Sequence, residues 1–188
     1  MSESNEYTPE QMDEIVARAQ GGDTGEFEKI YNAFIDKVYR YIYFRVNEED
    51  AIDLTESVFL KIWENLGTYK VGKLYFNAWV FKIAHNLIVD SYRSNKNTTS
   101  LEFEIVDEKK ESDPVLQAER SLSKEVLRNA IKSLKKKYQQ VILLKYINEL
   151  DNREIARIMN RSEGSLRILK FRALKALKQI LSDQNITF

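Results

Sequence analysis

Apolar side chains recur at intervals of three and four residues over most of this chain, and few residues interrupt the pattern. The 188 residues include only two prolines and six glycines. Proline and glycine are the residues that most disfavour a helix interior. Their scarcity, together with a spacing that repeats once per helical turn, therefore predicts an all-α protein.

Four or so helices are expected to share one core in the first half of the chain, and bounds are predicted for three of them. Residues 23–45 place seven apolar side chains on one helical face: Phe27, Ile30, Tyr31, Phe34, Val38, Tyr41 and Ile42. A second helix is expected over 49–66, with apolar Ile52, Val58, Phe59, Ile62 and Trp63, and a third over 76–93, with Trp79, Val80, Ile83, Leu87 and Ile88 facing inward. Gly67 and Gly72 indicate a loop, 67–75, between these two helices. Together these segments predict a first helical bundle over residues 1–96.

Residues 97–119 interrupt the helical pattern. Polar, turn-forming residues precede a stretch, 107–113, in which nearly every side chain is charged. Such a composition cannot bury enough apolar surface to offset the entropy of ordering the backbone. We therefore expect a flexible acidic linker, in which the short alternation Leu101, Phe103 and Ile105 becomes extended on binding a partner. A second helical bundle is expected over residues 120–188.

The charges of the chain are segregated along it. The chain has 29 basic and 29 acidic side chains, so its formal net charge is zero. Residues 121–188, however, hold 15 Lys and Arg against 6 Asp and Glu, whereas residues 100–120 hold 3 against 7 and residues 1–20 hold 1 against 5. A basic C-terminal third predicts contact with an anionic polymer.

Several classes of protein are disfavoured by what the chain lacks. Without cysteine there is no disulfide, no cysteine-based zinc site and no thiol catalysis, which is compatible with a reducing cytoplasm. His85 is the single histidine, and no glycine-rich phosphate loop is present. No apolar run approaches the roughly 20 residues of a membrane span, and the acidic, polar N-terminus does not resemble a signal peptide. We expect a cytoplasmic protein without membrane insertion, metal, cofactor or enzymatic activity.

The clearest local motif is a helix-turn-helix over residues 151–178. Asp151 followed by Glu154 fits a capping box that begins a short helix, 152–159. Residues 160–162 form a turn in which Ser162 can cap the next helix, expected over 163–181. The small residue Ala156 lies where the two helices would cross. The second helix is expected to bury Leu166, Leu169, Ala173, Leu177 and Ile180.

The opposite face of that second helix is basic. It carries Arg167, Lys170, Arg172, Lys175 and Lys178, and Arg161 lies in the turn. In helix-turn-helix proteins the second helix enters the DNA major groove, where arginine can pair with guanine and lysine with phosphate. A basic face alone is often only a solvated surface of a helical hairpin. Its combination with the capped turn and the short first helix favours DNA binding.

Both halves of the chain resemble a known family. The second half is similar to the C-terminal domain of sigma factors at Leu134 and at residues 141–146, 154–156, 162–167 and 172–177. Independently, residues 50–63 resemble the family's core-binding helix, and 76–90 its promoter-melting helix. The order and the gap also match, and the compact length implies the extracytoplasmic-function class. The resemblance implies a promoter-specificity subunit made of sigma region 2, a linker and sigma region 4.

The resemblance also implies three groups of functional residues. Binding to the β′ and β subunits of core RNA polymerase is expected from Asp50, Asp53, Leu54, Glu56 and Phe59. Opening and reading of the −10 promoter element is expected from Tyr69, Lys73, Lys82, Asn86 and Arg93. Reading of the −35 element is expected from Arg161, Ser165, Arg167, Lys170, Arg172 and Lys175. Phe171 could touch a thymine methyl group or pack inside, and packing is the favoured interpretation.

Other functions remain open at this stage. A stand-alone helix-turn-helix regulator would need no melting helix, yet residues 50–63 and 76–90 resemble sigma region 2. A sigma-like interaction protein that has lost promoter activity would show the same motifs. The family resemblance further implies that an anti-sigma protein binds between the two domains.

Overall fold

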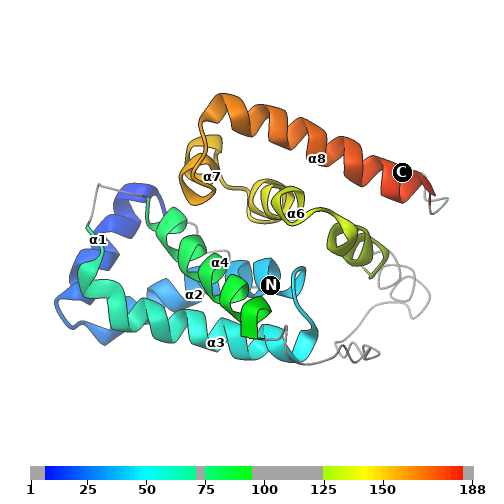
Figure 1. Ribbon diagram of the computed structural model, residues 1–188. Helices are drawn as coiled ribbons and strands as arrows, with labels where there is room; N and C mark the ends of the chain where they lie inside the picture. The colour runs from blue at the N-terminus through cyan, green and yellow to red at the C-terminus, as the bar shows by residue number, and fades with distance from the viewer. Residues whose placement is uncertain (1–6, 71–74, 95–124, 184–188) are drawn as a thin grey trace, which may run out of the picture.

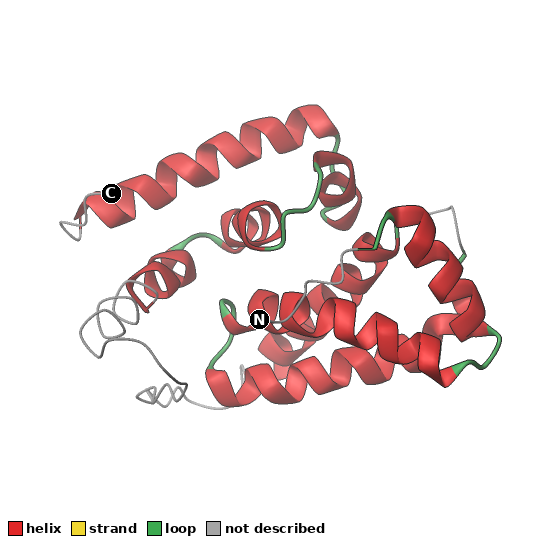
Figure 2. Cartoon of the chain, turned by 180° about the vertical axis from the view of Figure 1, so that it is seen from behind, coloured by secondary structure: helices red, strands yellow, loops and turns green. Residues whose placement is uncertain are grey.

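The computed structural model describes residues 7–70, 75–94 and 125–183, and every regular element in these ranges is helical (Figures 1 and 2). The prediction of an all-α protein is therefore confirmed. The segment expected to be a linker, 97–119, lies entirely outside the described residues.

The N-terminal half consists of α1 (Pro9–Gln20), α2 (Thr24–Tyr43), α3 (Glu48–Asn65), the short turn η1 (Leu66–Thr68) and α4 (Phe76–Ser94). The predicted bounds of α2, α3 and α4 agree with these to within two residues. No bounds were predicted for α1, because its acidic and polar residues obscure the apolar face formed by Met12, Ile15, Val16 and Ala19. That face packs on α2 and extends the bundle by one helix.

Side-chain caps start the first three helices. Thr8 forms a reciprocal capping box with Gln11, and the carboxylate of Asp23 accepts hydrogen bonds from two first-turn amides of α2. Asn47 accepts from the amide of Asp50 at the start of α3, at 2.9 Å. These oxygens satisfy backbone N–H groups that have no partner within the helix.

The core of this half comes from the faces that the periodicity predicted. Fully buried side chains include Ile30, Val38, Ile42, Val58, Ile62, Val80, Phe81 and Ile88. The buried Glu26 joins α1 to α2, because its carboxylate accepts from Arg18 at 3.2 Å and from Lys29 at 2.8 Å. These two cations stabilise the charged carboxylate and lower the pKa of Glu26.

The C-terminal half contains a helical stretch over residues 125–133, then α6 (Lys136–Ile142), the π-helical turn η3 (Leu143–Ile147), α7 (Asn152–Ile158) and α8 (Glu163–Asp183). Glu149 and Asn160 have φ angles of 57° and 50°. This left-handed conformation is tolerated better by asparagine than by most residues, and it reverses the chain between α7 and α8.

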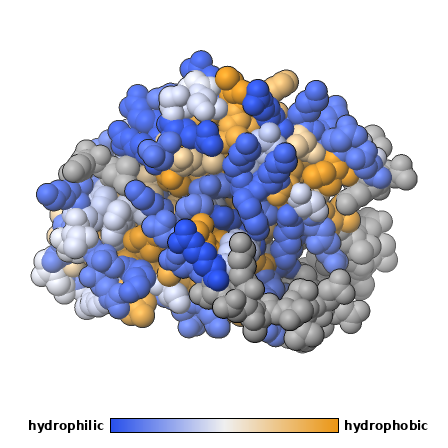
Figure 3. Space-filling model, viewed as in Figure 1, coloured by the Kyte–Doolittle hydropathy of each residue, from blue (hydrophilic) through white to orange (hydrophobic). Residues whose placement is uncertain are grey.

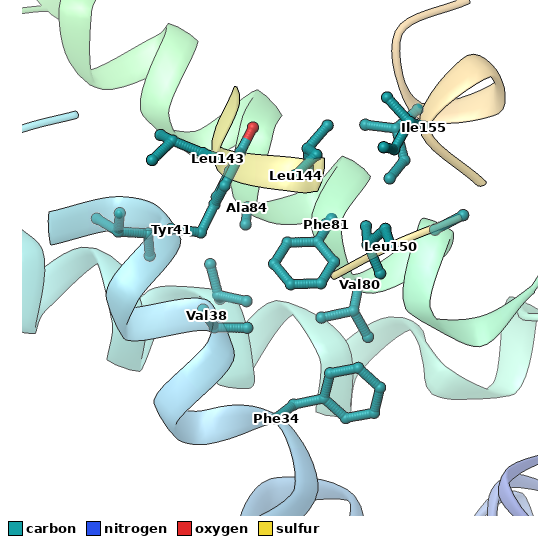
Figure 4. Packing of buried hydrophobic residues seen from close by; sticks show 14 of the residues in the cluster. Phe34, Val38, Tyr41, Val80, Phe81, Ala84, Leu143, Leu144, Leu150 and Ile155 are labelled. Carbon is teal, nitrogen blue, oxygen red and sulfur yellow. The ribbon is translucent and has the colours of Figure 1, made fainter. Parts of the chain in front are cut away.

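The two halves share one hydrophobic core. Helix α4 packs against α7, and α2 packs against η3. Figure 4 shows Phe81 and Ala84 of α4 facing Leu143, Leu144 and Leu150 of the C-terminal half. The sequence predicted two bundles on a tether and contained no signal for this contact. The basic face of α8 nevertheless remains exposed to solvent, because α8 packs through its opposite, apolar face, on which Leu166, Leu169 and Ala173 are buried.

Two structural findings concern membrane-spanning helices and metal-binding groups. Among the described helices, none is long and apolar enough to cross a membrane. Within the same ranges, no group of three or more histidine, aspartate or glutamate side chains could hold a metal ion.

Candidate nucleic-acid and partner interfaces

The helix-turn-helix has the local geometry that its sequence predicted. Asp151 accepts from the amide of Glu154 at 2.7 Å, and Glu154 accepts from the amide of Asp151 at 2.8 Å. Ser162 accepts from the amide of Ser165 at 3.3 Å, which caps α8. Ala156 is buried where α7 meets α8. These contacts hold α8 at a defined angle on α7 and leave its far face open.

The carboxylate of Glu154 is unusual because it is buried. Only 8% of Glu154 is exposed. Burial raises the pKa of the Glu154 carboxyl, opposed by the hydrogen bond from the amide of Asp151 and by the side chain of Asn77 in α4. Glu154 therefore belongs both to the cap of α7 and to the surface on which α7 meets the N-terminal half.

Most of the predicted −35 residues lie on the outer face of α8. Arg167, Arg172 and Lys175 are exposed. In contrast, Lys170 points along α7, because its Nζ lies 3.4 Å from Oδ1 of Asn152. The structure thus gathers three of the four predicted cations of α8 on one surface and places the fourth at its edge.

The turn contributes a further cation to this surface. Arg161 is exposed, and its guanidinium donates to the hydroxyl of Ser165 at 3.4 Å. The pairing orients Arg161 over the N-terminal end of α8. In helix-turn-helix proteins this end of the second helix approaches the base edges.

Apolar side chains lie among these cations, and the sequence interpretation missed them. The preference for packing Phe171 inside is wrong, since 70% of this residue is exposed. Ile168 is 55% exposed and Leu174 is 40% exposed. Figure 3 shows hydrophobic side chains among hydrophilic ones along the upper surface, where α8 runs. Counting residues around the helix could have found them, because the buried face is already filled by Leu166, Leu169 and Ala173.

The acidic side chains of α3 form a second surface. Asp53 and Glu56 are exposed, and Asp50 is partly exposed at the first turn. Leu54 is partly buried, and Phe59 is 6% exposed with its ring 4.6 Å from that of Tyr31. Phe59 therefore supports this surface from below, whereas the carboxylates form it.

Exposed apolar residues accompany these acids. Ile52, Leu60 and Trp63 are 52%, 58% and 48% exposed. The ring of Trp63 packs edge-on against Phe27 at 4.7 Å, so its position is defined. Ile52 and Trp63 were expected on the apolar side of the helix, so their exposure differs from the prediction. Carboxylates beside exposed aliphatic and aromatic groups are typical of a protein-binding surface.

Helix α4 presents a polar stripe to solvent. Lys82, Asn86 and Arg93 are all exposed. With 3.6 residues per turn, they project within about 40° of one another. Arg93 also pairs with Asp90 at 3.4 Å on the surface. The structure thus brings three of the five predicted −10 residues onto one face of one helix.

The other two predicted −10 residues are placed differently. Tyr69 is 5% exposed, with its ring 5.1 Å from Phe76 and 5.3 Å from Trp79. Burial, together with the nearby Asp13, raises its pKa to about 12. Tyr69 is thus a core residue in this structure, and the expectation that it lies ready on a loop is not met. Lys73 lies outside the described residues.

A buried cation lies beneath the inner side of α4. Arg45 is 4% exposed, donates to the hydroxyl of Tyr41 at 2.6 Å and lies 3.2 Å from Nδ1 of His85. Tyr92 donates to the carbonyl of Arg45. Burial and the adjacent guanidinium lower the pKa of His85 to about 4. His85 is therefore a neutral, structural partner of Arg45 at neutral pH.

Sequence comparisons match both halves of the chain. The family Sigma-70 region 2 matches residues 30–98, and the family Sigma-70, region 4 matches residues 124–177. The ECF RNA polymerase sigma factor BldN of Streptomyces coelicolor is 35% identical over 178 residues, covering 92% of this chain and 66% of that protein. The ECF RNA polymerase sigma factor SigW of Bacillus subtilis is 28% identical over 179 residues, covering 89% of this chain and 95% of its own length.

Solved structures show the same fold. CnrH, in complex with the cytosolic domain of CnrY, matches with a TM-score of 0.70 at 20% identity, covering 91% of this chain and 97% of that one. The sigma factor RpoE of Bartonella quintana, in complex with the anti-sigma factor NepR, matches with a TM-score of 0.66 at 17% identity, covering 84% and 97%. With both conserved regions matched in order, the chain belongs to the sigma-70 family, within its group of ECF sigma factors.

Proposed function

We propose that this chain is an alternative sigma factor that binds core RNA polymerase through α3, reads −35 duplex through α8 and engages the −10 strand through α4. The observation that carries the proposal is the match of both sigma-70 regions in order, with the polar face of each corresponding helix turned to solvent. The surfaces on α3, α8 and α4 differ in charge and in apolar content, and each therefore suits a different partner.

The outer face of α8 fits a major groove. Arg167 and Arg172 can each donate two hydrogen bonds to the acceptor edge of a guanine. The exposed Ile168 and Phe171 suit the methyl group of thymine, the one apolar group on a base edge in that groove. Lys175, further along the helix, suits a phosphate, and phosphate contacts fix the position of the helix rather than its sequence preference.

The stripe on α4 fits a single strand. Lys82 and Arg93 provide positive charge at two points along the helix, and Asn86 between them offers both a donor and an acceptor to an unstacked base. An exposed base loses stacking energy that a protein pocket must offset. The half-buried Trp79 and Tyr75, which precede Lys82 in the chain, are the aromatic side chains that we propose for this role.

The surface on α3 fits a basic, partly apolar protein partner. Asp53 and Glu56 would orient the partner by charge complementarity, and Ile52 and Trp63 would supply the apolar contact that gives most of the binding free energy. In a sigma factor this partner is the core enzyme. The chain itself then supplies specificity, and the polymerase supplies the catalysis.

Transcription in vitro tests the proposal against its main alternative. Purified chain added to bacterial core polymerase should direct initiation from a cognate promoter, and the chain without polymerase should shift little promoter DNA in a gel. A stand-alone regulator would bind its operator without polymerase. Absence of binding to core polymerase would contradict the assignment.

Regulation by a protein partner fits the same proposal. The structures of CnrH and of RpoE were both determined with a bound partner protein. We infer that an anti-sigma protein binds this chain too, and that the chain acts in the cytoplasm, where the polymerase lies, without catalysing a reaction of its own. Purification of the tagged chain from its native cell, with identification of a stoichiometric partner, tests this inference.

A further inference from the structure

Most of the positive charge of the C-terminal half lies outside the recognition helix. Residues 121–188 hold 15 Lys and Arg against 6 Asp and Glu, whereas α8 holds 5 against 2. Residues 126–148 hold 6 basic side chains and no acidic one, so two thirds of the excess positive charge of this half lies there. The functions proposed for α3, α4 and α8 use none of these six cations and leave the excess unexplained.

Four of the six cations form an exposed cluster where the helical stretch 125–133 meets α6 (Figure 1). This lysine patch consists of Lys132, Lys135, Lys136 and Lys137, all of which are exposed. The other two cations are held elsewhere. Arg128 is 2% exposed and stacks over the ring of Tyr43, and Nζ of Lys145 donates to the carbonyl of Leu150 at 3.0 Å. The exposed cluster is therefore made of lysine alone.

The lysine patch has no carboxylate that neutralises it. In the part of the chain that the structure describes, none of its four members forms an ion pair. The Nζ of Lys136 lies instead 3.9 Å from the centre of the Tyr92 ring. Burial, together with the like charges of Arg128 and Lys136, lowers the pKa of Lys132. The cations therefore repel one another, and a bound anion would relieve this repulsion.

The composition of the lysine patch favours a phosphodiester backbone over a protein surface. Protein interfaces have an apolar, often aromatic, centre. Within residues 126–148, all of which the structure describes, Tyr146 is the one large apolar side chain that is exposed, and it belongs to η3 rather than to the start of α6. Lysine binds phosphate as a flexible point charge, without the planar geometry by which arginine selects guanine. The patch therefore suits phosphates and carries no base preference.

The lysine patch and the outer face of α8 lie on different sides of that helix. Helix α6 packs against α8, and the buried side chains of α8, such as Leu169 and Ala173, face the elements packed on it. Arg167 and Arg172 are exposed on the opposite side. A duplex on the outer face of α8 therefore leaves the lysine patch free for another stretch of nucleic acid.

We propose that the lysine patch is a second, sequence-independent nucleic-acid site, which binds the phosphodiester backbone of a segment other than the −35 duplex. Each exposed ammonium group can neutralise one phosphate and release the counterion condensed on it. Affinity at this site depends on charge and on salt, whereas base preference comes from α8. The site exists whether or not α8 reads a −35 element, so the two assignments can fail separately.

Binding of labelled nucleic acid to the full-length chain tests the site. The variant Lys135→Gln/Lys137→Gln removes two charges from the lysine patch. The matched control Arg40→Gln/Lys61→Gln removes two exposed charges from α2 and α3. Fluorescence anisotropy at several salt concentrations measures Kd for a random-sequence DNA duplex and for a single-stranded RNA of the same length. Circular dichroism checks that both variants fold.

The salt dependence of Kd is the decisive quantity. Loss of two phosphate contacts should reduce the slope of log Kd against log salt by about 1.8 on the duplex or by about 1.4 on the single strand. The control should keep the slope of the wild type. The same reduction should appear in an Arg167→Ala background, because independent sites contribute additively. A change with one probe alone assigns the site to that form of nucleic acid. An unchanged slope and Kd with both probes overturns the proposal.

Two further measurements separate this site from the alternatives. If the lysine-patch variant loses affinity for polyglutamate but for neither nucleic acid, the partner is an acidic protein and the proposal is wrong. Promoter-specific transcription with core polymerase is scored separately. Its failure contradicts the sigma-factor function and leaves the binding result as it stands, whereas normal transcription without any change in slope contradicts the lysine-patch site alone.

Discussion

Arg167→Ala should reduce promoter use without weakening the protein or its binding to polymerase. Arg167 is exposed on α8, so truncation opens no cavity in the core, and the free energy of unfolding should change by less than about 0.5 kcal/mol. A bidentate arginine–guanine pair contributes about 1–3 kcal/mol of discrimination. The variant should therefore lose about 5- to 150-fold in the rate of initiation from a cognate promoter at limiting holoenzyme.

The assay compares holoenzyme made with each variant on the cognate promoter and on promoters substituted one base pair at a time in the −35 element. If Arg167 reads a base, the variant loses its preference at one position and keeps it elsewhere. If Arg167 contacts only phosphate, activity falls uniformly and the salt dependence weakens. Lys178→Ala, a basic residue toward the other end of α8, is the matched control and should cost less. Unchanged initiation by Arg167→Ala would refute the assignment of α8 as the recognition helix.

Three further outcomes follow from named contacts. Asp53→Arg, at an exposed position of α3, should weaken binding to core polymerase at least tenfold, because a charge reversal turns attraction into repulsion. Competition with the wild type for core polymerase measures this loss of affinity. Asp151→Ala should lower the free energy of unfolding by about 0.5–2 kcal/mol, because it removes the 2.7 Å acceptor of the Glu154 amide; urea denaturation measures it. Finally, the pKa of His85 is lowered to about 4 in the folded chain from an ordinary 6.5. The contribution of His85 to the free energy of unfolding is therefore present above pH 6.5 and is lost as the pH falls towards 4, because the unfolded chain binds the proton more readily. His85→Gln should flatten this part of the profile of stability against pH.

Controls separate these effects from general damage. Asp36→Arg, at an exposed acid of α2, reverses a charge away from the α3 surface and should leave core association intact. Ser182→Ala, at the exposed end of α8, should leave the free energy of unfolding unchanged. If the difference in stability between the wild type and His85→Gln is the same at pH 7 and at pH 5, the proton linkage assigned to His85 is wrong.

The local structure of this protein could be predicted because it depends on neighbours in sequence. The helix starts at Asp23 and at Asp151 follow from side-chain oxygens that reach amides two or three residues ahead. The apolar faces of α2 and α4 follow from the same short spacing. For the same reason the helix-turn-helix and the family resemblance could be identified from residues alone.

Exposure was predicted less well, because a periodic pattern does not say how wide the buried face is. Tyr69 lies two residues after Gly67 in a segment expected to be a loop, yet its ring packs against those of Phe76 and Trp79. Phe171 belongs to an apolar residue type, yet 70% of it is exposed, because none of the described helices covers it. The side of an amphipathic helix that is buried depends on which neighbours pack there and how much of it they cover.

The sequence by itself determined the helices, their caps, the basic face of α8 and the family, since each is encoded within a few residues or within one conserved region. The tertiary structure alone decided that α4 and α7 pack together, that α2 packs against η3, and that Arg128 is buried over Tyr43. Those contacts join residues far apart in the chain. Their free energy depends on shape and on the burial of polar groups, which no local pattern records.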